Sequence, residues 1–151
     1  MTSYKIIVFT DGGSRGNPGP AAVGFVIKDA SENLIKSHGE TIGEATNNEA
    51  EYRAVVSALK KIKALLGKKK CKELSVEVNM DSELVQKQLT GKYKIENKKL
   101  APFFLEIWNL KLDFGGVSFQ HLPRERNKEA DRMVNQALDD APGHSYPQLP
   151  F

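Results

Sequence analysis

Apolar residues recur along this chain with two different periods, and the changes between them predict where strands and helices lie. Short runs rich in β-branched residues, or alternating apolar and polar residues, predict strands over residues 6–10, 23–28, 34–41, 74–80 and 117–122. Apolar residues three or four positions apart predict helices over residues 46–66, 82–89, 98–112 and 127–138. The resulting order is βββαβααβα.

This order predicts an α/β fold. The short turn at residues 29–33 favours antiparallel pairing among the first strands. The later alternation of strand and helix favours a five-stranded mixed sheet with helices on both faces. A chain of 151 residues suits one core, so we expect one domain over residues 1–140 and a proline-rich tail over residues 141–151 without regular structure.

The first strand is followed by a carboxylate and a glycine-rich segment. Asp11 comes just after the apolar run 6–9, and residues 12–20 follow with four glycines and two prolines. A strand buried on both faces leaves a carboxylate at its tip poorly solvated, which favours a bound cation. The glycines let the backbone of a ligand approach closely. Asp-Gly also opens ordinary turns, so this segment alone leaves both interpretations open.

Glu51 is predicted to point toward the core. On a helix it shares one stripe with Val55 and Ile62. Glu49 falls on the opposite side, where with Thr46 it forms a capping-box pattern at the helix start. A glutamate in an apolar stripe is usually paired with a metal or a base, and a buried ion pair is the alternative here.

Two further aspartates end or begin elements. Asp81 follows the fourth strand, and sheets of this kind bind ligands at the carboxyl ends of their strands. Asp81 and Asp11 become neighbours if their strands are parallel. Asp131 lies at the edge of the last helix's apolar stripe, from which it can reach a cleft. There are simpler alternatives. In one, Asp81 or Ser82 only caps the next helix, and in another, Asp131 is only a carboxylate stabilised by the helix N-terminus near it.

Convergence of these carboxylates would predict a metal site. Carboxylates that share a cleft raise one another's pKa, and divalent cations relieve the repulsion. An all-oxygen ligand set suits Mg²⁺. Cys71 is the only cysteine, which excludes an internal disulfide and a cysteine zinc cluster.

Composition narrows the function less than these motifs do. The chain is 40% hydrophobic and 27% charged, as expected of a globular protein, and its net charge of +3 does not establish a polyanionic partner. It has no apolar run long enough to span a membrane and no signal-peptide pattern at its start. We expect a cytoplasmic monomer that requires no protein partner. Lysines cluster at residues 68–72, which suits a solvated loop, and at residues 87–99, which flank the candidate site.

Together, in this order, the motifs resemble the type 1 ribonuclease H family over roughly residues 4–140. The resemblance rests on residues 10–14 with 16–19, residues 46–51, residues 80–82, and His121 followed by residues 127–131. It implies the ribonuclease H-like fold and hydrolysis of the RNA strand of RNA–DNA hybrids, which leaves 3′-hydroxyl and 5′-phosphate ends.

By this resemblance two Mg²⁺ or Mn²⁺ ions are held by Asp11, Glu51, Asp81 and Asp131. One ion would activate the attacking water and the other would stabilise the leaving 3′ oxygen. His121 matches the family's mobile histidine, which aids proton transfer or product release. An ordinary loop histidine is the alternative.

The resemblance also implies a set of substrate-binding residues. The segment after Asp11 would contact the RNA 2′-OH through Gly12, Gly13, Ser14, Gly16 and Asn17. Residues expected to contact the two strands near the cut are Asn47, Asn48 and Ser82, and those of a phosphate pocket on the DNA strand are Thr46 and Asn97. Asn127, in the last motif, is also expected to contact substrate.

Two departures from some relatives affect substrate binding. A long basic protrusion with a tryptophan shrinks here to residues 90–98, and Trp108 belongs to the next helix, where we expect it in the core. We therefore expect weaker, more salt-sensitive binding. Glu44 stands where some relatives place an arginine of the phosphate pocket, so double-stranded RNA becomes a candidate second substrate. Two competing hypotheses are a catalytically dead nucleic-acid-binding module and a protein that docks a partner through its tail.

Overall fold

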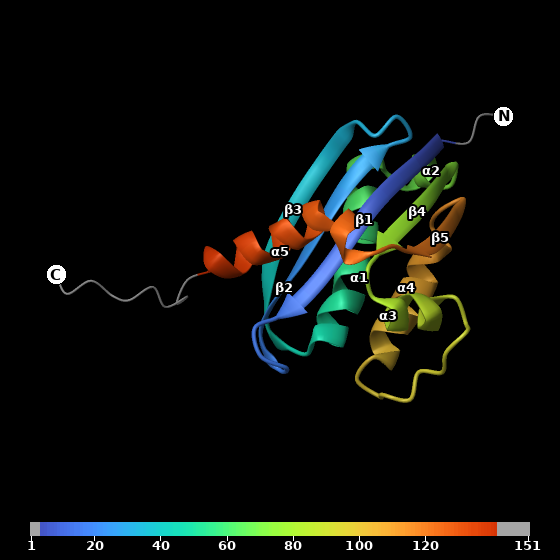
Figure 1. The fold of residues 1–151 in the computed structure, drawn as a ribbon. Coiled ribbons are helices and arrows are strands. Elements are labelled where there is room, and N and C mark those ends of the chain that lie inside the picture. Colours follow the sequence, from blue (N-terminus) through green and yellow to red (C-terminus); the bar gives the residue numbers. More distant parts are fainter. Residues whose placement is uncertain (1–3, 142–151) are drawn as a thin grey trace.

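The computed structural model describes residues 4–141, which form a mixed sheet covered by helices on both faces (Figure 1). The sheet has five strands in the order β3-β2-β1-β4-β5. Their bounds are β1 (Tyr4–Ser14), β2 (Gly19–Asp29), β3 (Leu34–Ala45), β4 (Leu74–Met80) and β5 (Gly116–His121). The first three are antiparallel, whereas β4 and β5 run parallel to β1. The predicted α/β class and five-stranded mixed sheet are confirmed.

The helices divide between the two faces of the sheet. One face carries α1 (Asn47–Leu66), α3 (Glu83–Leu89) and α4 (Ala101–Lys111), and α5 (Lys128–Asp139) crosses the other (Figure 1). A short helix, α2 (Lys68–Cys71), follows α1. No helix within residues 4–141 has the length and apolarity needed to cross a membrane. The predicted tail lies outside the described residues except for Ala141.

Alternation along the strands builds an apolar layer on each face. Phe25 and Val8 belong to the large core beneath α1, which also buries Tyr52 and Leu59 of that helix. On the other face Ala22 packs against Val134 of α5. At Gly24 and Gly39 the strands have no side chain, and this lets the α5 backbone lie directly on β2 and β3.

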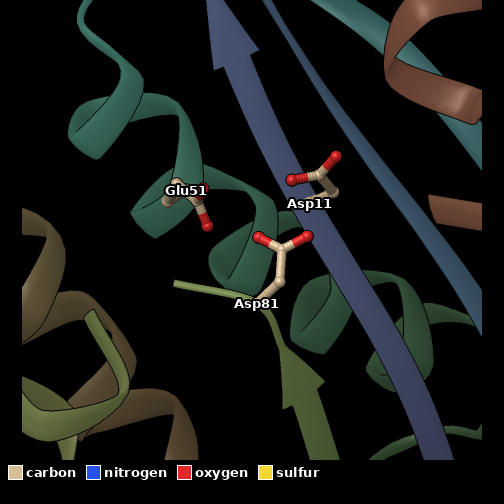
Figure 2. A group of neighbouring side chains, drawn as sticks. All are labelled: Asp11, Glu51 and Asp81. Atoms are coloured by element: carbon tan, nitrogen blue, oxygen red, sulfur yellow. The ribbon is translucent and has the colours of Figure 1, made fainter. Parts of the chain in front are cut away.

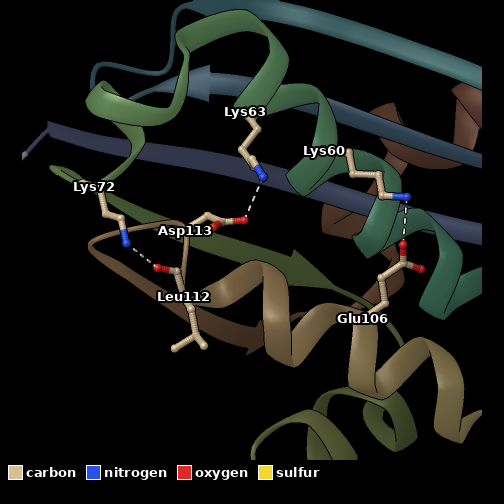
Figure 3. Close-up of polar contacts among 6 residues, drawn as sticks. All are labelled: Lys60, Lys63, Lys72, Glu106, Leu112 and Asp113. Atoms are coloured by element: carbon tan, nitrogen blue, oxygen red, sulfur yellow. Dashed lines mark hydrogen bonds and ion pairs between the residues drawn. The ribbon is translucent and has the colours of Figure 1, made fainter.

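Polar contacts join α4 and its C-terminal turn to α1 and to Lys72, which lies between α2 and β4 (Figure 3). Lys60 and Glu106 form an ion pair at 2.8 Å, as do Lys63 and Asp113. The hydrogen bond from Lys63 holds the pKa of Asp113 below its ordinary value. These side chains are partly exposed, so they add little to stability, and the apolar contacts of Ile107 carry the packing.

Some predicted boundaries were wrong. The first strand continues to Ser14 because residues 11–14 pair with β2, so only residues 15–18 form the turn. Helix α4 begins at Ala101 rather than residue 98, since Pro102 fits only a helix's first turn. Trp108 is 50% exposed and stacks on Phe104, with Lys111 over its ring, so its predicted place in the core was wrong.

Gly24 tests the close packing of α5. A Cβ there would lie 2.7 Å from the Ala130 carbonyl oxygen and 2.8 Å from Met133 Cβ. We expect Gly24→Ala to lower the free energy of unfolding by about 1–3 kcal/mol, because the helix must shift. Gly116→Ala is the control, since no atom lies within 4 Å of its added Cβ. Equal denaturation midpoints for the two variants would contradict this packing.

Candidate active site

Asp11 lies where β1 loses one of its two neighbours. The parallel pairing of β1 with β4 ends at Thr10 and Met80, whereas pairing with β2 continues past Asp11. Asp11 is therefore inside a strand rather than at its tip, which corrects the sequence prediction. The end of β4 leaves space beside it. Asp81 enters that space immediately after Met80. β1 and β4 are parallel neighbours, so the condition under which Asp11 and Asp81 come together is met.

Gly12 brings Glu51 to the same place. A Cβ on Gly12 would lie 2.2 Å from the carbonyl carbon of Ala50, so only glycine lets the first turn of α1 rest on β1. Thr46 and Glu49 cap that helix with the predicted reciprocal hydrogen bonds. Glu49 is thus used at the cap, and Glu51 turns inward.

The three carboxylates converge (Figure 2). One oxygen from each of Asp11, Glu51 and Asp81 lies within 4.8 Å of the others. Asp11 is only 8% exposed, and its Oδ1 accepts a hydrogen bond from the Gly12 N–H at 3.0 Å. They line a cavity of about 420 Å³.

Burial and repulsion keep protons on this cluster. Burial, with the neighbouring charges of Asp81 and Asp131, raises the pKa of Asp11 to about 8. Burial, with the charges of Asp11 and Asp81, raises the pKa of Glu51 to about 9. Arg124 acts in the opposite direction on Glu51. Without a cation, the folded protein therefore favours protonated forms of both groups near neutral pH.

Asp131 comes to this cavity from the opposite face of the sheet. It lines the same space from α5 and raises the pKa of Asp11, although it is outside the tight group of three. Asn135, one turn later, donates to its Oδ2 at 3.3 Å. The four predicted carboxylates thus reach one cavity.

Asn127 is held inside the structure. It is 1% exposed, and its Nδ2 donates to the Thr10 carbonyl at 2.9 Å and to Asp81 Oδ2 at 3.2 Å. Its Oδ1 has no hydrogen-bond partner among the described residues. Its amide bonds a carboxylate and the end of β1, so it supports Asp81 from inside the structure, and its contact with substrate stays a prediction.

The other predicted substrate residues divide into two groups. Those that line the cavity are Gly12, Gly13, Ser14, Asn47, Asn48 and Ser82. Gly16, Asn17, Thr46 and Asn97 lie outside its lining, as does His121, which was predicted to be catalytic. Asn17 Oδ1 accepts from the Asn47 N–H at 3.0 Å, and Asn47 Oδ1 accepts from the Ser14 N–H at 2.9 Å. This chain of bonds fixes the turn against α1.

Two arginines of the cavity were not predicted. Arg15 lines it and pairs with Asp139 at 2.6 Å, and Arg124 lines it near Glu51. Arg124 lies in a 3₁₀ turn (Arg124–Arg126) between β5 and α5. It follows the carboxyl end of a strand, so the reasoning used for Asp81 applies to it also. His121, three residues earlier, ends β5 and is exposed.

The donor set fits hard divalent cations. All the close groups are carboxylates, and the raised pKa values of Asp11 and Glu51 reflect burial and a repulsion that a bound cation would relieve. Arg124, which lines the cavity, supplies only a single positive charge. Asp11, Glu51 and Asp81, with Asp131 beside them, could therefore hold a hard divalent cation.

Comparisons with known proteins agree with this geometry. The family model described as "Reverse transcriptase-like" matches residues 9–137. Ribonuclease HI of Halobacterium salinarum is 41% identical over 137 residues, which cover 91% of this chain and 66% of that protein. The crystal structure of the Halobacterium ribonuclease H1 superposes with a TM-score of 0.84, over 91% of this chain and 99% of that one. This chain belongs to the type 1 ribonuclease H family.

Other members show the same fold. LC11-RNase H1, from compost, solved in complex with an RNA/DNA hybrid, is 44% identical with a TM-score of 0.84 and covers 89% of this chain and 96% of its own. The bifunctional protein Rv2228c of Mycobacterium tuberculosis is 36% identical over 138 residues. This chain spans about two thirds of the Halobacterium ribonuclease and 36% of the mycobacterial protein.

The raised pKa values predict how metal-free stability depends on pH. The folded-state pKa values of Asp11 and Glu51 lie above the ordinary 3.8 and 4.5, so their contribution is complete below about pH 4 and is lost as pH rises toward 8 and 9. In chelator, we expect the free energy of unfolding to fall between pH 5 and pH 9. Asp11→Asn should flatten this fall and add about 1–3 kcal/mol at pH 8.

Denaturant unfolding at several pH values measures this effect. Glu44→Gln, which neutralises an exposed carboxylate on β3, is the control and should leave the slope as it is. A lower midpoint for Asp11→Asn than for the parent protein at pH 8 would contradict the crowded cluster.

Proposed function

We propose that this chain is a metal-dependent endoribonuclease that hydrolyses the RNA strand of RNA–DNA hybrids. The observation that carries the proposal is the meeting of Asp11, Glu51 and Asp81 in one cavity, with Asp131 at its wall. A protein that only binds nucleic acid gains nothing from mutually repelling buried carboxylates, which cost folding free energy. The hybrid-bound relative LC11-RNase H1 supports the choice of substrate.

Two Mg²⁺ or Mn²⁺ ions would be held by Asp11, Glu51, Asp81 and Asp131. When bound, such ions supply activation of a water nucleophile and stabilisation of the leaving 3′ oxygen, which yields 3′-hydroxyl and 5′-phosphate ends. The protein's own part is to fix the carboxylates before substrate arrives. Gly12 sets the distance between α1 and β1, and Asn127 holds Asp81.

Polar groups around the cavity would recognise the substrate backbone. Ser14, Asn47 and Asn48 line it from β1 and α1, and Ser82 lines it from the start of α3. Hydroxyls and amides of this kind can bond a 2′-OH, which separates RNA from DNA. The arginines of the cavity add positive charge for phosphate, and Arg124 lies near the reacting centre.

Residues outside the cavity would act farther along the two strands. Thr46 and Asn97 remain proposed contacts to the DNA strand, where Glu44 would weaken the hold on phosphate. His121 remains the proposed aid to proton transfer or product release. Since it ends β5 outside the cavity, this role requires it to approach the substrate when the complex forms.

A cleavage assay tests the proposal directly. Labelled RNA–DNA hybrid, double-stranded RNA and duplex DNA are incubated with the protein in Mg²⁺, in Mn²⁺ and in chelator. We expect cleavage of the RNA strand of the hybrid only when metal is present. Cleavage of both RNA substrates would favour the broader enzyme, and hybrid binding without cleavage would favour the dead binding module and refute the proposal.

Two glutamates of one helix provide the matched test. Glu51→Gln should lower the rate of hybrid cleavage at least about a thousandfold, because it removes a carboxylate from the cluster. Glu49→Gln keeps the capping geometry and should stay within about twofold of the parent rate. Equal losses from both changes would contradict the assignment of Glu51.

A further inference from the structure

A buried chain of hydrogen bonds links α1 to a loop rich in lysine. The lysine loop is residues 90–99, which connect α3 to α4. The Tyr52 hydroxyl donates to Gln88 Oε1 at 2.6 Å, and Gln88 Nε2 donates to the Lys94 carbonyl oxygen at 3.1 Å. Tyr52 is 0% exposed and Gln88 is 6% exposed. The bonds therefore run from the core of the protein to the middle of the loop.

Burying the Tyr52 hydroxyl and the Gln88 amide costs free energy, and packing alone gives no reason for polar groups at these positions. Apolar side chains of the same size would fill the space without needing partners, whereas a buried amide or hydroxyl must be bonded. The pair is satisfied only when the Lys94 carbonyl stays in one place.

Backbone hydrogen bonds fix the two ends of the loop, whereas Gln88 and Ile95 hold its middle. Near α3 the amides of Lys92 and Tyr93 donate to the Lys87 carbonyl at 2.8 and 3.1 Å. At the far end the Leu100 amide donates to the Asn97 carbonyl. Between them, the side chain of Ile95 packs against the core, and Gln88 holds the neighbouring carbonyl.

The loop presents positive charge at the end of the molecule where the candidate active site lies. Lys92, Lys94, Lys98 and Lys99 are exposed, and none has a carboxylate within 4 Å among the described residues. Figure 1 shows the loop beside α3 and α4, at the end where α1 begins. Tyr52 itself is the residue after Glu51. None of these four lysines lines the cavity itself.

We propose that Tyr52 and Gln88 are positioning residues that hold the lysine loop where its lysines bind the phosphate backbone of the substrate beyond the cut site. This positioning role rests on the proposed function. It explains how a short loop could take the place of the long basic protrusion that some relatives carry. A loop fixed before binding loses less conformational freedom when the lysines meet phosphate. Each lysine that neutralises a phosphate also adds to the salt dependence of binding.

Binding and turnover of the hybrid test the effect on substrate. Tyr52→Phe removes one hydroxyl, and Gln88→Met removes both bonds while keeping the chain length. We expect each to weaken hybrid binding in chelator three- to tenfold, to reduce the slope of log affinity against log salt, and to raise KM with kcat within twofold. Ile62→Val, a buried change farther along α1, is the control for a general loss of stability and should leave hybrid affinity and KM unchanged.

Limited digestion with trypsin measures how firmly the loop is held, and this measurement does not depend on nuclease activity. We expect Tyr52→Phe and Gln88→Met to be cut faster than the parent protein at Lys92 and Lys94, with no such change in Ile62→Val. If digestion is unchanged, or if the loop loosens while hybrid affinity and KM stay as they were, the positioning role is wrong. If the parent protein does not cleave hybrid in metal, the proposed function fails, whereas faster digestion with weaker hybrid binding still supports the positioning role.

Discussion

Repulsion among Asp11, Glu51 and Asp81 is the constraint around which the rest of this structure is arranged. One oxygen from each lies within 4.8 Å of the others. Without a cation, burial together with this repulsion makes Asp11 and Glu51 more stable protonated than as anions near neutral pH. Such a site costs folding free energy, which must come from elsewhere in the fold. The large core beneath α1 supplies this free energy. Gly12 lets α1 pack closely on β1, and Asn127 bonds Asp81, so both residues help to fix the positions of the carboxylates.

The sheet gathers these groups from both of its faces. β1 and β4 end their parallel pairing side by side, which places Asp11 and Asp81 together, while α1 brings Glu51 from one face and α5 brings Asp131 from the other. The closeness depends on small residues, because Gly12 admits α1 and Gly24 admits α5. Precision at the site is therefore a consequence of close packing between backbones, where a single added methyl group would push the elements apart.

Much of this was predictable from the sequence, and the reasons differ by residue. The stripe of α1 and its capping box separate Glu51 from Glu49 because helical geometry is regular. The extension of β1 to Ser14 was not predictable, since it depends on pairing with β2. The exposure of Trp108 and the burial of Asn127 depend on which elements meet in space. Arg124 was missed because it stands in a loop without a periodic pattern, although its place after β5 was a usable signal.

The titration of the carboxyl groups is the most direct test of the crowded cluster. Carbon-13 NMR of the aspartate and glutamate side chains, followed against pH in chelator and again in Mg²⁺, reports these groups themselves. We predict that Asp11 titrates near pH 8 and Glu51 near pH 9 without metal, and that both midpoints fall by several units when Mg²⁺ binds. Midpoints near pH 4 for both groups in the metal-free protein would contradict the repulsion on which the proposed metal site rests.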